Sequence, residues 1–267
     1  MSTVRRILPL AAGIVALLGI TSLPVRAQDA VEKMSETGVM HVAVQTQGPP
    51  ISFVDKNGQR TGLAVEIVKK LAEASGLKLD LLDYDWKGLI PAVLSKKADF
   101  IAADMTPTQK RALKLNFTIP IFYSEVRSIA MKDKGFKSWK DLDKEGVSIG
   151  VVQASSYVDM VKHYMPKATL KEFAGGGPSV AQAVASGRVD AAVMDRGGAM
   201  QYVNAYPGMQ ILEGVIRKEP LAFAIRPEDT HLLQFLNNYI RFIQTDGELD
   251  QLVDYWWNST DWEKDHK

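Results

Sequence analysis

The sequence predicts an α/β protein made of two lobes of the same kind, with a ligand cleft between them. Three observations support this fold class. Strands and helices alternate along the chain after residue 28, the alternation restarts after Ser124, and one segment recurs without a gap in both halves. Because a strand–helix–strand order produces a mainly parallel sheet covered by helices, each half is expected to build its own sheet.

The first half alternates short apolar runs with amphipathic segments. Apolar residues recur at helical spacing from Ala64 to Ala72, and Gly76 is expected to end that helix. Asn57-Gly58 is a strong turn signal between two short strands. Strands are expected at residues 39–45, 51–54, 59–62, 77–81 and 99–103, and a second helix at residues 86–96.

The second half repeats this order. Pro166 is expected to stop one helix, and Pro178 suits the first turn of another, after three glycines that predict a flexible entry. The expected strands are residues 147–152, 169–173, 189–194 and 221–225. The expected helices are residues 156–165 and 178–186, followed by two more around Gly247.

The repeat is visible in the residues themselves. Residues 93–104 align without a gap with residues 184–195, and both segments run through a helix end, a turn, an aspartate, an apolar strand and a second aspartate. Asp104 and Asp195 therefore end equivalent strands, one in each lobe. Ligands of open α/β sheets bind beyond the carboxyl ends of the strands, so these two aspartates are expected to face the cleft.

Residues 1–27 have the pattern of an export signal. Arg5 and Arg6 precede an apolar run, and small residues allow cleavage near Ala27. The alternative, a membrane anchor, is disfavoured because the run is shorter than the roughly 20 residues that a spanning helix needs. The mature chain is expected to be periplasmic and free in solution, because no second run of spanning length follows.

Composition excludes several classes of function. The signal segment carries Arg5, Arg6 and Arg26, so without it the 32 basic residues no longer exceed the 31 acidic ones, and the basic patches typical of nucleic-acid binding are missing. The absence of cysteine excludes disulfides, thiolate metal sites and a lipid-bearing cysteine. No cofactor and no metal is expected.

Six stretches resemble one family in order and spacing. They are Pro-Pro-Ile-Ser-Phe-Val at 49–54, Gly-Leu-Ala-Val-Glu at 62–66, Trp-Lys-Gly-Leu-Ile-Pro-Ala at 86–92, Thr-Pro-Thr-Gln-Lys-Arg at 106–111, Phe-Thr-Ile-Pro-Ile-Phe-Tyr at 117–123 and Gly-Arg-Val-Asp-Ala at 187–191. Over residues 36–258 the chain resembles the solute-binding proteins of family 3, which serve ABC importers of polar amino acids.

The resemblance implies a type II periplasmic binding protein. Two crossover strands, near residues 125–131 and 219–224, would join a discontinuous lobe 1 (residues 28–125 and 224–267) to lobe 2 (residues 126–223). The lobes would close around an amino-acid-like ligand, with the crossover strands absorbing the dihedral change. The liganded form would dock, as a monomer, on an inner-membrane ABC permease.

The resemblance also assigns roles in the site. Arg111 and Thr106 match the residues that bind the ligand carboxylate, and arginine offers the two-pronged geometry that a carboxylate prefers. Asp195 matches the aspartate that holds the ammonium group, although it also suits the N-cap of a helix starting near Gly197. Ser155 and Ser156 would offer N–H groups and hydroxyls, Trp86 one aromatic wall, and Gln45 a polar strand end.

Two positions depart from the family pattern. Gly48 stands where many members carry an aromatic residue, so one wall is expected to be missing. Asp104 stands where glycine is usual, and this added carboxylate either favours a cationic ligand or caps the turn at residues 107–111. The identity of the amino acid is left open.

Two other classes of function are alternatives to this interpretation. Exported cyclohexadienyl dehydratases share this fold, but their catalytic glutamate is absent from the matching stretch Ala154-Ser155-Ser156-Tyr157-Val158. Asp104 is the residue that could substitute as a proton-transfer group. A sensory domain would need a membrane segment or a fused module. The sequence therefore predicts a binding protein and not an enzyme.

Overall fold

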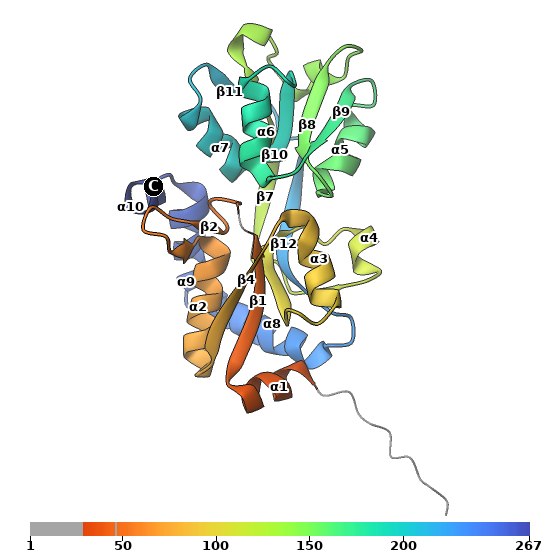
Figure 1. Cartoon of the computed structure of the whole chain (residues 1–267). Helices are drawn as coiled ribbons and strands as arrows, with labels where there is room; N and C mark the ends of the chain where they lie inside the picture. The colour runs from red at the N-terminus through yellow and green to blue at the C-terminus, as the bar shows by residue number, and fades with distance from the viewer. Residues whose placement is uncertain (1–28, 46) are drawn as a thin grey trace, which may run out of the picture.

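The computed structural model describes residues 29–45 and 47–267, so the predicted export signal lies outside the described residues. The chain forms two α/β lobes, one above the other in Figure 1, joined by long strands that run between them. Within the part of the chain that the structure describes, no helix combines the length and apolar character that crossing a bilayer requires.

The lower lobe of Figure 1 is built from both ends of the chain. Its strands are β1 (Val39–Gln45), β2 (Phe53–Val54), β3 (Arg60–Thr61), β4 (Lys78–Tyr84), β5 (Phe100–Met105) and β6 (Asn116–Phe117). Its helices are α1 (Ala30–Thr37), α2 (Leu63–Ser75), α3 (Trp86–Leu94), α4 (Gln109–Ala112), α8 (Thr230–Thr245), α9 (Glu248–Val253), the π-helical turn η3 (Asp254–Asn258) and α10 (Trp262–His266). Strand β1 lies between β4 and β5 and is parallel to both, as the sequence predicts.

The upper lobe repeats this plan. Its strands are β8 (Ser148–Val152), β9 (Thr169–Phe173), β10 (Ala191–Asp195) and β11 (Met209–Ile211). Its helices are α5 (Ser156–Tyr164), α6 (Gly176–Ala185) and α7 (Arg196–Ala205), with 3-10 turns η1 (Lys132–Lys134) and η2 (Trp139–Leu142). Strand β8 lies between β9 and β10 and is parallel to both.

Two long antiparallel strands join the lobes. Strands β7 (Phe122–Met131) and β12 (Arg217–Ile225) pair with each other from Phe122–Leu221 to Val126–Arg217. Strand β12 continues beside β5 in the lower lobe, and β7 continues beside β10 in the upper lobe. The predicted crossover segments are therefore real, although both strands begin before the predicted positions. The limits predicted for the lobes stay a prediction.

The repeated segments have the same structure in both lobes. Each runs from a helix end through a residue with positive φ, which is Lys96 (φ 61°) in one lobe and Gly187 (φ 71°) in the other. Asp99 then accepts a hydrogen bond from the His41 backbone N–H at 2.8 Å, and Asp190 accepts one from the Ser148 backbone N–H at 2.9 Å. The aspartate in the turn thus tethers its strand to the neighbouring strand in each lobe.

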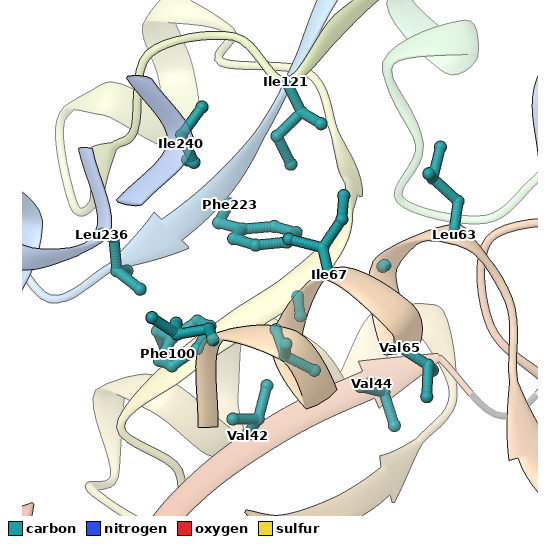
Figure 2. Packing of buried hydrophobic residues seen from close by; sticks show 14 of the residues in the cluster. Val42, Val44, Leu63, Val65, Ile67, Phe100, Ile121, Phe223, Leu236 and Ile240 are labelled. Carbon is teal, nitrogen blue, oxygen red and sulfur yellow. The ribbon is translucent and has the colours of Figure 1, made fainter. Parts of the chain in front are cut away.

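The lower lobe has a core on one face of its sheet. The apolar side of α2, including Leu63 and Ile67, packs on residues of the central strands such as Val42 and Phe100, as Figure 2 shows. Phe100 and Phe223 lie with their ring centroids 5.9 Å apart, which ties β12 to β5. Gly76, in a left-handed conformation (φ 67°), ends α2 as predicted.

Other predicted elements differ in their bounds. Helix α6 begins at Gly176, before Pro178, because Gly175 and Gly176 both adopt positive φ and lead directly into the helix. The three glycines are therefore part of an ordered helix start and not a flexible entry. Pro178 lies in the first turn of the helix, as predicted.

Candidate functional site

A pocket of about 60 Å³ lies between the two lobes, which we call the interlobe pocket. It lies at the carboxyl ends of β1, β5, β8 and β10, the position at which open α/β sheets bind ligands. Seven of the predicted site residues line it: Gln45, Trp86, Asp104, Thr106, Ser155, Ser156 and Asp195. Arg111 is not among the lining residues.

Asp104 and Asp195 bring two carboxyl groups to the same pocket. Burial and the nearby Asp195 carboxylate raise the pKa of Asp104 to about 7, and the charge of Arg111 offsets only part of this effect. Burial also raises the pKa of Asp195, although a backbone N–H bond from Gly198 opposes the shift. Both groups therefore resist carrying a negative charge together in this pocket.

The two aspartates differ in their partners. Asp195 is the N-cap of α7 and accepts a hydrogen bond from the Gly198 N–H at 2.6 Å, which confirms the predicted cap. The cap of the turn after Asp104 is Thr108, whose hydroxyl accepts from the Arg111 N–H at 3.3 Å. The capping alternative for Asp104 is therefore wrong. Its buried Oδ1 has no hydrogen-bond partner among the described residues.

Arg111 lies behind the pocket wall and links the lobes. Its Nη1 donates to the carbonyl of Thr106 at 2.8 Å, and its Nη2 donates to the carbonyl of Ala154 in the other lobe at 3.1 Å. The guanidinium also lies 5.5 Å from the centre of the Trp86 ring, within range of a cation–π contact. One N–H group of Arg111 thus binds Thr106 in its own lobe, one binds Ala154 across the lobes, and others stay available.

The carbonyl of Ala154 joins the lobes a second time. The indole Nε1 of Trp86 donates to it at 3.3 Å. Ala154 has a positive φ of 59°, which is uncommon for a residue with a Cβ, and its carbonyl accepts from both lobe 1 donors, Trp86 and Arg111. Trp86 is therefore both a wall of the pocket and an interlobe contact.

A third acid, Glu219, was not predicted as a site residue. Its Oε2 accepts hydrogen bonds from the Thr106 hydroxyl at 2.9 Å and from the Ser156 hydroxyl at 3.0 Å. Glu219 is 2% exposed and lies on the crossover strand β12. The hydroxyl of Ser155 is also occupied, since it donates to the Val152 carbonyl at 2.6 Å. The Ser155 N–H donates to the same carbonyl at 3.3 Å. This leaves the N–H groups of Ser156 and Tyr157, in the first turn of α5, as donors without an internal acceptor.

The glycine at position 48 is explained by its neighbour Gln45. A Cβ at Gly48 would lie 2.4 Å from the Gln45 amide oxygen, so the space of the missing aromatic wall is filled by this side chain. The loop also meets the other lobe closely. A Cβ at Gly176 would lie 2.4 Å from the carbonyl oxygen of Gln47. The lobes are therefore in contact on this side of the pocket.

Aromatic residues from unexpected positions complete the wall. Trp257, Tyr157 and Tyr202 line the pocket, and none was predicted. Trp257 comes from the π-helical turn η3 and is 4% exposed. It packs on Phe122 with ring centroids 4.7 Å apart and approaches Gly197 of the other lobe. Burial and the nearby carboxylates raise the pKa of Tyr157 and Tyr202, so both stay neutral phenols.

The chemistry of the lining suits binding of a charged small molecule. Among residues 29–45 and 47–267, no group of three or more histidine, cysteine, aspartate or glutamate side chains could hold a metal ion. The pocket combines two carboxylates, hydroxyls and aromatic faces, with an arginine behind one wall. A few placed polar groups in a mainly closed pocket are typical of small-molecule sites.

Known proteins match almost the whole chain. The family described as bacterial extracellular solute-binding proteins, family 3, matches residues 40–259. The L-cystine-binding protein TcyJ of Escherichia coli (strain K12) is 25% identical over 252 residues, covering 92% of this chain and 94% of that protein. The chain is thus similar over its length to a binding protein.

Two solved structures have the same fold. The ancestral amino acid-binding protein AncCDT-1, described as a precursor of cyclohexadienyl dehydratase, is 32% identical with a TM-score of 0.79, covering 85% of this chain and 99% of that one. A binding component of an ABC transporter from Wolinella succinogenes, complexed with lysine, is 30% identical with a TM-score of 0.78 and the same coverage. The two-lobed fold is therefore confirmed.

Proposed function

We propose that this chain, which belongs to the bacterial extracellular solute-binding proteins of family 3, captures an amino acid with a positively charged side chain for an ABC importer. The observation that carries the choice of ligand is the pair of carboxyl groups, Asp104 and Asp195, in one pocket. The amino-acid part of the proposal is supported by relatives that bind amino acids, one of them with lysine.

The charge of the pocket favours a cation. Asp104 has an unpartnered buried oxygen, and the charge of Asp195 disfavours its ionised form. A ligand ammonium or guanidinium placed between the two would give Asp104 a donor and would remove the repulsion. A ligand with a neutral or acidic side chain offers only its α-ammonium group, which Asp195 takes, and would leave the buried Asp104 oxygen without a donor.

The remaining polar groups receive the backbone end of the ligand. Arg111 and the first N–H groups of α5, at Ser156 and Tyr157, form the carboxylate subsite, where a helix start favours an anion. Asp195 receives the α-ammonium group. The Thr106 hydroxyl joins it in place of the carboxylate role expected from the sequence, because its proton is donated to Glu219 and its lone pairs remain. Trp86 and Gln45 close the pocket around the ligand side chain, and Trp257 supplies the aromatic wall that Gly48 lacks.

Closure of the lobes is the expected mechanism. In the liganded form the contacts of Ala154 with Trp86 and Arg111 would hold the lobes together, while β7 and β12 bend. The closed protein, exported to the periplasm and cleaved near Ala27, would then dock on the permease as a monomer. Like the similar L-cystine-binding protein TcyJ, it would act by binding and not by catalysis.

A thermal-shift screen of the purified protein against the common amino acids tests the proposal. A ligand at a hundred times its dissociation constant adds about 2.7 kcal/mol to the native state. Arginine, lysine or ornithine should raise the melting temperature most. The largest rise with glutamate or with an apolar amino acid, or no rise with any, would contradict it.

A further inference from the structure

Glu219 is a buried acid on β12, one of the two strands that join the lobes. Its neighbours Arg217 and Lys218 are exposed, whereas Glu219 is 2% exposed and points inward. In register it lies opposite Ser124 of β7. A buried carboxylate is stable only when hydrogen bonds or ion pairs offset its desolvation. The residues that bind Glu219 are therefore held in fixed positions.

Glu219 binds two hydroxyls that come from different lobes. Thr106, just after β5, and Ser156, at the start of α5, both donate to the same oxygen of Glu219, at 2.9 and 3.0 Å. The two hydroxyl oxygens are 3.4 Å apart. Both residues also line the interlobe pocket, whereas Glu219 lies behind them. The Thr106 and Ser156 side chains thus separate the Glu219 carboxylate from the pocket.

The positions of the protons follow from this geometry. A hydroxyl has one proton and two lone pairs, and a carboxylate only accepts. A hydrogen bond to a charged acceptor is about twice as strong as one between neutral groups, so both protons point at Glu219. Toward the pocket, Thr106 and Ser156 therefore present lone pairs.

Hydroxyls held in this way discriminate between the two ends of an amino acid. A ligand carboxylate at these oxygens would set lone pair against lone pair, whereas an ammonium group would donate to both. Two arginines balance the negative charge of Glu219, and they leave the lone pairs of the two hydroxyls directed toward the pocket. Arg217 Nε lies 3.6 Å from Glu219, and Glu219 also acts electrostatically on Arg111.

We propose that Glu219 is a specificity-determining positioning residue, which fixes the Thr106 and Ser156 hydroxyls as acceptors for the α-ammonium group of the ligand. This rests on the proposed function. It deepens it by adding Glu219 and the Ser156 hydroxyl to the ammonium subsite formed by Asp195 and Thr106.

The test compares L-lysine with 6-aminohexanoate, which is lysine without the α-ammonium group. Calorimetry should give an affinity ratio that reports how much this group contributes. In Glu219→Gln the side-chain amide donates as well as accepts, so the hydroxyls are free to turn. The ratio should fall by about tenfold, the loss expected from one hydrogen bond to a charged group.

Two further measurements separate orientation from charge and from folding. Glu125→Gln removes a carboxylate from the partner crossover strand, where it pairs with Arg127 and Lys218 outside the interlobe pocket, and should leave the ratio unchanged. In a Thr106→Val/Ser156→Ala background the hydroxyls are gone, so adding Glu219→Gln should change the ratio by less than about twofold.

The outcomes distinguish the two proposals. If lysine and arginine both fail to bind the wild type, the proposed function is overturned. If lysine binds but Glu219→Gln lowers only the melting temperature and keeps the ratio, the role of Glu219 is overturned. An equal change with and without the hydroxyls would also overturn it. If Glu219→Gln does not fold, Ser156→Ala alone must lower the ratio, because it removes one acceptor.

Discussion

Replacing Asp104 with asparagine should make the protein more stable at high pH, although it removes a pocket residue. Burial and the Asp195 carboxylate raise the pKa of Asp104 from an ordinary value of 3.8 to about 7. The folded state therefore binds the proton more tightly than the unfolded chain. Below pH 3.8 Asp104 does not lower the free energy of unfolding. The loss grows as the pH rises from 3.8 to 7 and is complete above pH 7.

The size of the effect follows from the two pKa values. A difference of this size corresponds to about 4 kcal/mol of lost stability above pH 7. The unpartnered Oδ1 is present in both the acid and the amide, so its cost cancels in the comparison. For a chain of this size, about 4 kcal/mol corresponds to a shift in melting temperature of roughly 10 °C.

The assay is thermal unfolding of wild type and Asp104→Asn at pH 4 to 8. We expect the variant to melt about 10 °C higher at pH 8, with the difference almost gone at pH 4. Asp190→Asn is a matched contrast of opposite sign. Burial opposes ionisation of Asp190, but hydrogen bonds from Lys134 and Ser148 prevail and lower its pKa to about 2. This variant should lose stability above pH 4.

The reasoning would be refuted if wild type and Asp104→Asn differed in melting temperature by the same amount at every pH. A variant less stable than wild type at pH 8 would also refute it. The same variant should bind lysine more weakly. Gain of stability together with loss of affinity is expected of a charged group that is kept for a ligand.

Three more predictions follow from the site. Arg111→Lys should weaken lysine binding by about 2 kcal/mol in calorimetry, because an ammonium group cannot bind two carbonyls and a carboxylate in one plane. The control, Lys110→Arg, keeps the ion pair with Asp159 and should change the affinity little. Equal affinities in both variants would speak against the role of Arg111. Trp257→Leu should lower affinity by at least about 1 kcal/mol by removing a wall, whereas Trp139→Leu, which packs away from the pocket, should lower only the melting temperature; the reverse pattern would count against the wall. The purified protein should not convert prephenate or arogenate, and turnover that Asp104→Asn abolishes, followed by product absorbance, would show that it is an enzyme.

Much of the fold can be predicted from the sequence because it rests on local periodicity. Strand β1 has the predicted bounds, and the repeat of residues 93–104 in residues 184–195 has the same turn and the same tethering aspartate in both lobes. The strand ends then follow from topology. This explains why Asp104, Asp195 and Thr106 line the pocket as predicted, since each lies at the end of a strand.

The residues that were missed depend on long-range pairing. Glu219 stands between a lysine and a proline in a polar stretch, where sequence patterns indicate an exposed position. It becomes buried only because β12 pairs with β7 between the lobes. Trp257 has the pattern of an ordinary apolar residue near the C-terminus, and it reaches the pocket from the π-helical turn η3. No local signal distinguishes either residue.

The most direct test of the central claim is calorimetry with L-arginine and L-citrulline on protein freed of bound ligand by unfolding and refolding. Citrulline has nearly the shape of arginine but no side-chain charge, so the pair isolates the effect of the charge. Two facing carboxyl groups, one of them unpartnered, predict that arginine binds at least about a hundredfold more tightly, a difference of about 2.7 kcal/mol. Affinities within about threefold of each other would contradict the account.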